Sequence, residues 1–474
     1  MTEPEQTGAN PADDTIAALA TGGGGAIACI RVSGSKALEA VSRIFSVHSG
    51  KSLRETEPGK MRRGIVADRA ERIDEVMTVR FEAPRSYTGE DTVEITCHAS
   101  PYIANRILSL LIRHGCRAAR PGEFTRRAFL NGKMDLLQAE AVADLIASSS
   151  AAAHRTALNQ MRGGFSMELT LLRARLLEFV SALELELDFG EEEGLVFADR
   201  NKLQRNATDI AAIIDKLKNS FAAGNAIKNG VPTAIVGETN AGKSTLLNLL
   251  LKDDKAIVSE IPGTTRDVVE DLAVLSGIPF RFFDTAGIRN TDNRVELLGI
   301  ERTFKKTAEA SIVLWIIDAR TPDAQVSKLA EKLLPLTADK KLILVVNKID
   351  VASPEQIAAK TILLADAIPD RLFISALAGI NADKLEARLA TLANITETDE
   401  HETTVTSVRH YEALKNASEA LVRVGEGLAA NIPSDLIAQD VRECVRHLGT
   451  IVGAGEITAE EVLGEIFSKF CIGK

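Results

Sequence analysis

The nine residues GETNAGKST (Gly237–Thr245) restrict the possible fold more than any other stretch of this chain. They follow the apolar run TAIV (233–236) and lead into the apolar run TLLNLLL (245–251). The pattern G-x-x-x-x-G-K-[ST] between a strand and a helix predicts a loop whose backbone N–H groups face phosphate oxygens. We expect Lys243 to reach the β- and γ-phosphates of a nucleotide and the Ser244 hydroxyl to bind Mg²⁺.

Apolar strand-length runs alternate with helical stretches throughout residues 230–394, which predicts a Ras-like parallel α/β domain around the phosphate loop. Residues 1–134 mix β-rich runs with helical stretches and predict a separate N-terminal α/β or α+β domain. Segments 135–229 and 395–474 are helical, with apolar residues every three or four positions. Both need a partner for their apolar faces. We therefore predict one discontinuous helical domain with the α/β domain inserted into it, and a separate small C-terminal bundle is the alternative.

Individual residues mark these helices. A stripe of apolar residues at helical spacing runs through the segment 135–229. In one interpretation, Gly163–Gly164 interrupts this stripe. In the C-terminal segment one helix is marked by Leu414, Leu421, Val424 and Leu428, and a second by Leu436, Val441, Val445 and Leu448.

The composition excludes several classes of protein. The 474 residues carry a formal net charge of −10, with 45% hydrophobic and 26% charged residues, as in ordinary globular proteins. The first fifteen residues lack the basic and apolar regions of a signal peptide. The apolar runs are far shorter than the roughly 20 residues that span a bilayer. We expect a cytoplasmic protein without a membrane segment.

The five cysteines are scattered, and no CxxC pair occurs, which indicates reduced thiols without a disulfide framework or a zinc site. The final residues CIGK do not form a prenylation box, because glycine stands where an aliphatic residue is required. Cys471 is therefore either a buried small hydrophobe at a helix end or part of a site.

A local excess of positive charge occurs in Arg113–Lys133, where six Lys and Arg residues accompany the single acid Glu123. Two interpretations remain open for this stretch. It forms a solvated basic face, or it contacts an anion or RNA.

Three further motifs follow the phosphate loop in the order that a GTP-binding domain requires. GTTRD (263–267) supplies Thr265 as a second Mg²⁺ ligand, and DTAG (284–287) supplies an aspartate near Mg²⁺ and an N–H group for the γ-phosphate. NKID (347–350) ends in an aspartate that accepts hydrogen bonds from guanine N1–H and N2–H₂, and ISAL (374–377) offers an N–H group to O6. The predicted GTP-binding residues are Asn240, Ala241, Gly242, Lys243, Ser244, Thr245, Ser259, Glu260, Ile261, Pro262, Gly263, Thr264, Thr265, Asp284, Thr285, Ala286, Gly287, Asn347, Lys348, Ile349, Asp350, Ser375, Ala376 and Leu377.

Hydrolysis needs another group, because Ile288 occupies the position after DTAG where many switch GTPases have a water-orienting glutamine. An arginine finger contributes roughly 10³–10⁵ in rate. Arg266, Arg289 and Arg294 are nearby candidates.

The combination of motifs resembles the MnmE/TrmE family of tRNA-modification GTPases. The resemblance is carried by Asn240, by GTTRD and by DTAGIRNTDNRVELLGIERT (284–303). The N-terminal stretches SYTGEDTVEI (86–95) and ARPGEFTRRAFLNGKMDLLQAEAVADLI (119–146) and the final FCIGK also match. The resemblance covers essentially the whole chain apart from its acidic N-terminal tail.

The resemblance implies a K⁺ ion in the place of an arginine finger. Its ligands would be the Asn240 side chain and oxygens of Ser259, Ile261 and Thr264. A monovalent cation held by such oxygens supplies positive charge near the β- and γ-phosphates of the nucleotide. The resemblance further implies that Glu296 orients or activates water, and that the K⁺ loop forms fully when two of these domains face one another.

The resemblance also implies that the N-terminal domain forms a homodimer and binds 5-formyl- or methylene-tetrahydrofolate. The matching positions are Arg31, Glu94, Lys133 and Lys474. A carboxylate suits the N–H groups of a pterin ring, and cations suit the glutamate tail. Cys471 would line this site beside the chain end.

From this resemblance we expect a K⁺-stimulated GTPase that acts with an FAD-dependent partner protein. Together they would drive C5 modification of the wobble uridine of certain tRNAs. The folate would supply the carbon and glycine or ammonium the amine, with the inserted domain as motor and the helical domain as lever. The alternative is a ribosome-assembly GTPase, which shares the nucleotide motifs and has no need of a folate pocket.

Overall fold

The computed structural model describes most of the chain, in two compact units. The units are Met1–Ala143 together with Gly449–Lys474, and Asp144–Leu448. The described residues are 14–22, 25–48, 52–189, 200–251, 270–284, 309–393, 403–453, 460–468, 470 and 472–473. None of the helices in these ranges is long and apolar enough to cross a membrane.

The first unit contains a seven-stranded sheet in the order β3-β4-β5-β6-β2-β1-β7, antiparallel except where β1 pairs with β7. Its elements are β1 (Thr15–Leu19), β2 (Ile27–Ser33), α1 (Ala37–Ser42), β3 (Phe45–Val47), η1 (Leu53–Glu55), β4 (Arg62–Asp68), β5 (Glu71–Phe81), β6 (Thr92–His98), α2 (Pro101–Arg113), β7 (Cys116–Ala118), α3 (Glu123–Leu130), α15 (Glu460–Ser468) and α4 (Leu136–Ala147), whose residues from Asp144 onward belong to the second unit.

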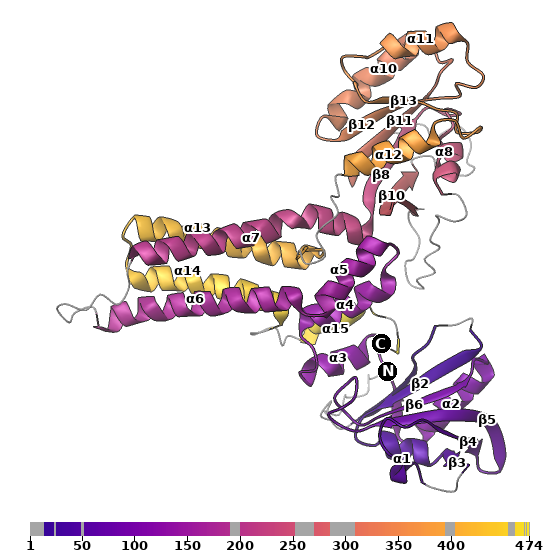
Figure 1. The fold of residues 1–474 in the computed structure, drawn as a ribbon, viewed down its shortest axis with the longest axis vertical. Helices are drawn as coiled ribbons and strands as arrows, with labels where there is room; N and C mark the ends of the chain where they lie inside the picture. Colours follow the sequence, from indigo (N-terminus) through magenta and orange to yellow (C-terminus); the bar gives the residue numbers. More distant parts are fainter. Residues whose placement is uncertain are drawn as a thin grey trace, which may run out of the picture. The chain divides into compact units, whose positions relative to one another are not determined.

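The alternation of side chains along β2 explains the two faces of this sheet. Ala28, Ile30 and Val32 are buried in the core that α1 and α2 cover (Figure 1). Arg31 lies between them in sequence and therefore points to the opposite face, because successive strand residues alternate. On that face Phe124 of α3 is fully buried against Ile16 and its neighbours.

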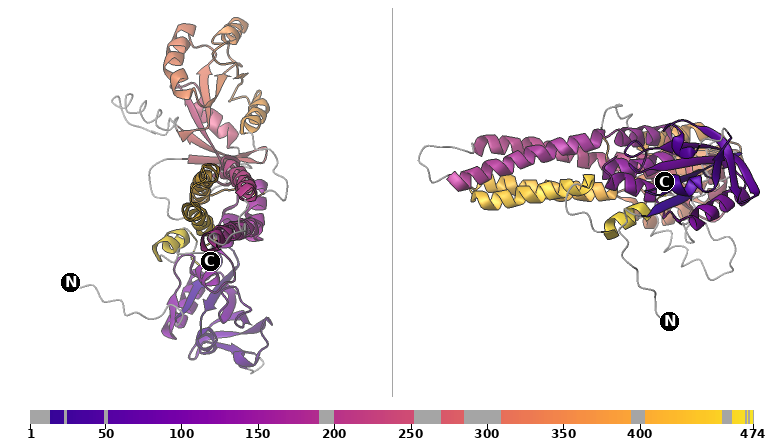
Figure 2. Two further views of the ribbon diagram at one scale, coloured as in Figure 1. Left: turned by 90° about the vertical axis from the view of Figure 1, so that its left-hand side faces the viewer. Right: turned by 90° about the horizontal axis from the view of Figure 1, so that it is seen from below.

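The second unit contains a long helical bundle. Its helices are α5 (Ala151–Met161), α6 (Gly164–Phe189), α7 (Arg200–Asn229), α13 (Val408–Ala429) and α14 (Ser434–Val452), the last of which ends in the first unit. Helices from before and after the inserted sheet lie side by side in each view (Figures 1 and 2). The predicted stripe in the first segment is divided between α5 and α6 at Gly163, whose φ is +84°.

The apolar face of α14 lies one residue from its predicted position. Leu436 was expected to mark this face, and the expectation is wrong, because Leu436 is 51% exposed and Ile437 is 1% exposed. From Ile437 the buried positions continue through Val441, Val445 and Leu448 at helical spacing.

The second unit also contains a six-stranded sheet in the order β13-β12-β11-β8-β10-β9, in which β9 alone is antiparallel to its neighbour. Apolar clusters cover both faces, so Ile312–Ile317 of β11 are buried without interruption. The elements are β8 (Val231–Gly237), α8 (Lys243–Leu250), β9 (Glu270–Leu275), β10 (Ile278–Asp284), β11 (Ile312–Asp318), α10 (Asp323–Leu333), η2 (Leu334–Thr337), β12 (Lys341–Asn347), α11 (Pro354–Ile362), β13 (Arg371–Phe373) and α12 (Ala382–Ala393).

A close backbone approach fixes the segment that returns from this sheet to the bundle. An ideal Cβ at Gly224 of α7 would lie 2.2 Å from the Val405 carbonyl oxygen. The Val405 N–H donates to Ser220 Oγ at 3.0 Å, and Val405 is fully buried.

We predict that Gly224→Ala destabilises the protein by about 2 kcal/mol, since the new methyl group overpacks this contact. Gly425→Ala in α13 is the matched control, because the nearest atom to its Cβ position is 3.7 Å away. The control should be neutral or stabilising by about 1 kcal/mol, as alanine favours a helix over glycine. Thermal unfolding of both variants measures the difference. Equal stabilisation by both substitutions would contradict the close packing.

Candidate functional site

The phosphate loop lies between the carboxyl end of β8 and the first turn of α8. Gly242, the residue before α8, has φ +103°, and its Cβ position lies 2.2 Å from Asn347 Nδ2. A side chain here would be both strained and in collision, so the position requires glycine. Ser244 and Thr245 are exposed in the first turn of α8. This helix N-terminus with two accessible hydroxyls suits a phosphate group and its Mg²⁺.

The buried side chain of Asn347 joins three segments at the carboxyl ends of the strands. Its Nδ2 donates to the Ala241 carbonyl oxygen at 2.9 Å, and its Oδ1 accepts from the Ala376 N–H at 2.9 Å. The side chain belongs to a residue that is 2% exposed. Because β8, β12 and β13 run parallel, their carboxyl ends meet at one edge of the sheet, where ligands bind in such folds.

The segments NKID and ISAL lie against one another. The Ile349 N–H donates to the Ile374 carbonyl oxygen at 3.2 Å. Asp350 is exposed in the turn after β12, and Leu377 is 84% exposed, whereas Ser375 is fully buried. The predicted guanine contacts are thereby brought to the same edge as the phosphate loop.

Two lysines extend over the phosphate loop. Lys243 Nζ donates to the carbonyl oxygens of Gly237 and Glu238 at 2.7 and 2.8 Å. Lys348 Nζ donates to the Asn240 carbonyl oxygen at 2.6 Å and pairs with Asp318 at 3.0 Å.

Asp318 ends β11, between the phosphate loop and NKID in the sheet. Hydrogen bonds from Arg320, and to a lesser extent from Lys348, hold the pKa of this carboxyl well below its usual range. Asp318 is therefore ionised at neutral pH and orients Lys348 over the loop.

Other predicted nucleotide and cation ligands lie outside the described residues, as does Glu296. For Asp284 the structure describes the backbone, at the end of β10, and not the side chain. The positions outside are Ser259, Glu260, Ile261, Pro262, Gly263, Thr264, Thr265, Thr285, Ala286 and Gly287, with the arginine candidates Arg266, Arg289 and Arg294 and with Ile288.

In the first unit, two of the four predicted folate residues form a pair. Arg31 of β2 and Glu94 of β6 are direct cross-strand neighbours, and Arg31 Nε donates to Glu94 Oε1 at 2.8 Å. The guanidinium carbon lies 5.1 Å from the centroid of the Tyr87 ring and 5.6 Å from that of Phe124. The Nζ of Lys133 donates to the Pro84 carbonyl oxygen at 3.0 Å.

At least three of the six basic residues in the stretch Arg113–Lys133 form ion pairs, namely Arg113, Arg117 and Arg127. Arg127 is 8% exposed by its side chain and pairs with Asp14, Glu90 and Glu123. Arg117 pairs with Asp14 and Glu123 at 2.6 Å each. The buried Arg127 fits neither a solvated face nor an RNA contact, so both interpretations are wrong for this residue, whereas the side chain of Arg117 is 39% exposed. The stretch looked unbalanced because most of the acids come from distant parts of the chain.

The C-terminal segment, which belongs to the first unit, packs against helices from the N-terminal part of that unit. Phe467 and Phe470 are buried against α3 and α4. Gly473, with φ +95°, lies so close to the end of β1 that an ideal Cβ would be 2.1 Å from the Leu19 carbonyl oxygen. Cys471 and Lys474 themselves lie outside the described residues.

Three of the other thiols are poor nucleophiles. Burial raises the pKa of Cys97 and of Cys116 to about 11, and that of Cys444 to about 12. At neutral pH these groups are thiols, which react slowly compared with thiolates.

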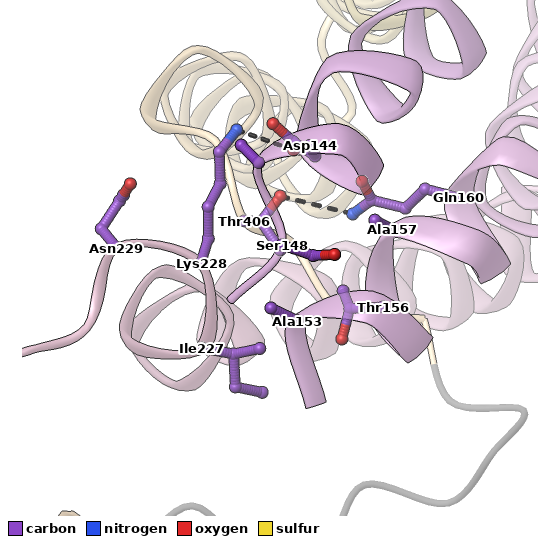
Figure 3. A pocket seen from close by; sticks show the side chains of 11 residues that line it. Asp144, Ser148, Ala153, Thr156, Ala157, Gln160, Ile227, Lys228, Asn229 and Thr406 are labelled. Atoms are coloured by element: carbon purple, nitrogen blue, oxygen red, sulfur yellow. Dashed lines mark hydrogen bonds and ion pairs between the residues drawn. The ribbon is translucent and has the colours of Figure 1, made fainter. Parts of the chain in front are cut away.

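A pocket of about 100 Å³ in the second unit lies where the chain enters and leaves the six-stranded sheet (Figure 3). Gln160 of α5, 5% exposed, donates from Nε2 to the Thr404 carbonyl oxygen at 3.0 Å. Lys228, near the end of α7, pairs with Asp144 at 2.7 Å. Two residues later Gly230 connects α7 to β8. The incoming and outgoing connections are thus held at one place.

Sequence reasoning missed several of these residues. Asp318 ends a strand like the predicted NKID and was identifiable by that position. Tyr87, Phe124 and Gln160 belong to no chemical motif, and only the tertiary structure brings them to their partners.

Comparison with known proteins extends over nearly the whole chain. Residues 15–133 match the profile "GTP-binding protein TrmE N-terminus", and residues 136–471 match "MnmE helical domain". The chain is 55% identical to "tRNA modification GTPase MnmE" of Bacteroides fragilis, over 97% of this chain and 99% of that protein. It is 53% identical to the protein of that name from Bacteroides thetaiotaomicron, with the same coverage. It is 51% identical to that from Parabacteroides distasonis, over 97% of this chain and the full length of the relative.

Two domain profiles match the chain, and the three relatives named above have nearly the same length and are more than 50% identical to it. These matches agree with the nucleotide-binding loops that the structure brings together at one edge of the sheet. This chain belongs to the MnmE/TrmE family of GTPases.

Proposed function

We propose that this protein couples K⁺-stimulated GTP hydrolysis to C5 modification of the wobble uridine, position 34, in certain tRNAs. As a member of this family it is a GTP-hydrolysing enzyme of tRNA modification. The observation that carries the proposal is the convergence of the phosphate loop, NKID and ISAL on Asn347 at one edge of a parallel sheet.

The described part of the nucleotide site fits GTP and Mg²⁺. Lys243 and the N-terminus of α8 would bind phosphate oxygens, and Ser244 would bind Mg²⁺ together with Thr265. Asp350 would select guanine through two hydrogen bonds that adenine cannot supply. Lys348, now on the Asn240 carbonyl oxygen, would flank the base.

The K⁺ site is proposed from the family resemblance and from the chemistry of its ligands. Asn240 is exposed on the phosphate loop with φ +65°, so its amide oxygen is accessible to a cation next to the phosphates. Ser259, Ile261 and Thr264 would complete the site. The ion would supply positive charge next to the phosphates. Ile288 cannot orient the attacking water by a hydrogen bond, and Glu296 would do so instead.

The first unit is proposed to bind the folate that supplies the carbon. Arg31 and Glu94 share one face of the sheet, and Gly473 brings the chain end to the end of β1, the strand beside β2. This docking supports a role for Lys474 in the site and for Cys471 in its lining. The N-terminal domain would form the homodimer, and an FAD-dependent partner protein and tRNA would complete a cytoplasmic complex.

The helical domain is proposed to transmit the GTPase cycle. We retain the boundaries 1–134, 135–229, 230–394 and 395–474 for the N-terminal, helical, inserted and second helical segments. Any movement of β8 is passed to α7 across Gly230, and Gln160 holds the returning chain against α5. A buried amide that loses its partner costs about 1–3 kcal/mol, so this contact favours one arrangement of the two connections.

Replacing K⁺ by Na⁺ should lower the GTP turnover number at least ~10-fold, because the smaller ion fits the oxygen ligands poorly and the transition-state charge is left uncompensated. The affinity for a fluorescent GDP analogue should change little. Steady-state turnover and equilibrium titration in matched buffers measure both quantities. Equal turnover in the two salts would refute the cation mechanism.

Gln160→Leu should separate hydrolysis from modification, since leucine preserves the volume and cannot donate to the Thr404 carbonyl oxygen. We expect GTP turnover within about twofold of wild type. In a strain lacking the gene, the variant should restore much less wobble-uridine modification than wild type does, by mass analysis of tRNA nucleosides.

Thr156→Val, in the same pocket, is the matched control and should restore modification fully. A deletion strain with unchanged wobble modification would refute the function itself. Full rescue by Gln160→Leu would refute only the coupling role of this side chain.

A further inference from the structure

The carboxylate of Asp318 is shared between two cations beside the phosphate loop. Asp318 is the last residue of β11, and in the sheet it lies opposite Asn347, the residue before Lys348. Its Oδ2 pairs with Lys348 Nζ at 3.0 Å and accepts from Arg320 Nη2 at 2.7 Å. Its Oδ1 accepts from Arg320 Nε at 3.0 Å and from the Arg320 backbone N–H at 2.9 Å. Both oxygens are therefore engaged.

Arg320 fixes the direction in which Asp318 points. Its guanidinium meets the two carboxylate oxygens with two separate nitrogens, the geometry in which an arginine orients a carboxylate best. The bond from its backbone N–H ties the same carboxylate to the turn after β11. The side chain of Asp318 is 16% exposed, so these bonds are largely shielded from water. The carboxylate is thus a fixed anion to which the ammonium of Lys348 is directed.

The contact that Lys348 makes with the phosphate loop joins two unusual backbone positions. Lys348 and Asn240 both have φ +65°, a conformation that is uncommon for residues other than glycine and that surrounding contacts must stabilise. Lys348 Nζ donates to the Asn240 carbonyl oxygen at 2.6 Å. Asp318 is the acid that balances the charge of this ammonium at 3.0 Å. The ion pair therefore supports the contact between NKID and the phosphate loop.

We propose that Asp318 is a positioning residue for the guanine site and that, through Lys348, it slows the release of the bound nucleotide. The stem of a lysine can lie along a flat apolar surface while its ammonium is held at one end. Because Asp318 already holds Lys348 on the loop, a nucleotide that binds beside the stem does not have to order this long side chain. This inference rests on the proposed contact of Lys348 with the base.

The negative charge at position 318 is needed, and a neutral acceptor would serve less well. Hydrogen bonds between ionised partners are roughly twice as strong as those between neutral ones. Without the carboxylate, the Asn240 carbonyl oxygen is the other partner of the Lys348 ammonium among the described residues. The ammonium would then leave the loop more often, and the base would lose the support of the lysine stem.

Release of a fluorescent GDP analogue from the full-length protein tests the proposal, with excess GDP added in a stopped-flow instrument. Asp318→Asn preserves the shape of the side chain and removes its charge. It should raise the dissociation rate constant on the order of 10-fold, because Lys348 loses a charge-assisted bond and such losses act mainly on dissociation. Arg320→Met should raise the rate constant by a smaller factor, since Asp318 then keeps Lys348 and loses its other support.

Asp370 offers a matched control. It forms an ion pair of the same geometry with Arg388, with 3.0 Å from Nε to Oδ1 and 2.7 Å from Nη2 to Oδ2. Asp370 precedes β13, so it lies at the amino end of this parallel strand and at the opposite edge of the sheet from the nucleotide loops. Asp370→Asn should change the dissociation rate constant by less than about twofold.

Combination with Lys348→Met distinguishes positioning from a general structural role. If Asp318 acts through Lys348, Asp318→Asn should change the rate constant by less than about twofold in a protein that already carries Lys348→Met. A general loosening of the site would raise the rate constant by the same factor in both backgrounds. Thermal unfolding shows that each variant is folded. Arg320→Met, at an exposed side chain, replaces Asp318→Asn in this comparison if the latter does not fold.

The outcomes separate the inference from the proposed function. Wild type that does not bind the GDP analogue refutes the guanine site and this inference with it. Wild type that binds, together with an Asp318→Asn rate constant equal to its own, leaves the guanine site standing and overturns the inference. The same factor in the presence and in the absence of Lys348→Met also overturns it.

Discussion

The nucleotide edge of the six-stranded sheet depends on one side-chain amide. Asn347 donates to the phosphate loop and accepts from the segment that follows β13, so one group fixes both loops relative to β12. Because Asn347 is buried, each hydrogen bond that its side-chain amide loses would cost about 1–3 kcal/mol of folding free energy. The two loops are therefore held in one arrangement. Gly242 belongs to the same constraint, since any side chain there would occupy the position of the Asn347 amide.

In the first unit, ion pairs between side chains that are distant in sequence hold the elements together. Arg117 and Arg127 are neutralised by acids from several elements, which fixes α3 against the sheet. Arg117 and Arg127 are therefore structural residues in this unit. Among the described residues, Arg31 pairs with one acid, Glu94. Charge counted along the sequence does not reveal these pairs, because the partners are distant in sequence.

Much of this architecture is predictable from local pattern. Continuous apolar runs such as SIVLWIID mark strands buried on both faces, and the glycine spacing of the phosphate loop marks its turn. Short or polar strands were missed, among them β3 and β7 with three residues each, because pairing and not composition makes them strands. The α14 face was misplaced by one residue, since Leu436 and Ile437 are equally apolar and only packing chooses between them. The contacts of Gln160 and Tyr87 likewise require the fold.

The most direct test of the account is the affinity of Asn347→Asp for guanine nucleotides. The substitution preserves shape and the acceptor for the Ala376 N–H, and replaces the donor to Ala241 by a carboxylate oxygen. We predict that titration with a fluorescent GDP analogue shows affinity reduced on the order of 100-fold, with a folded protein by thermal unfolding. An affinity equal to that of wild type would contradict the claim that this amide assembles the nucleotide site.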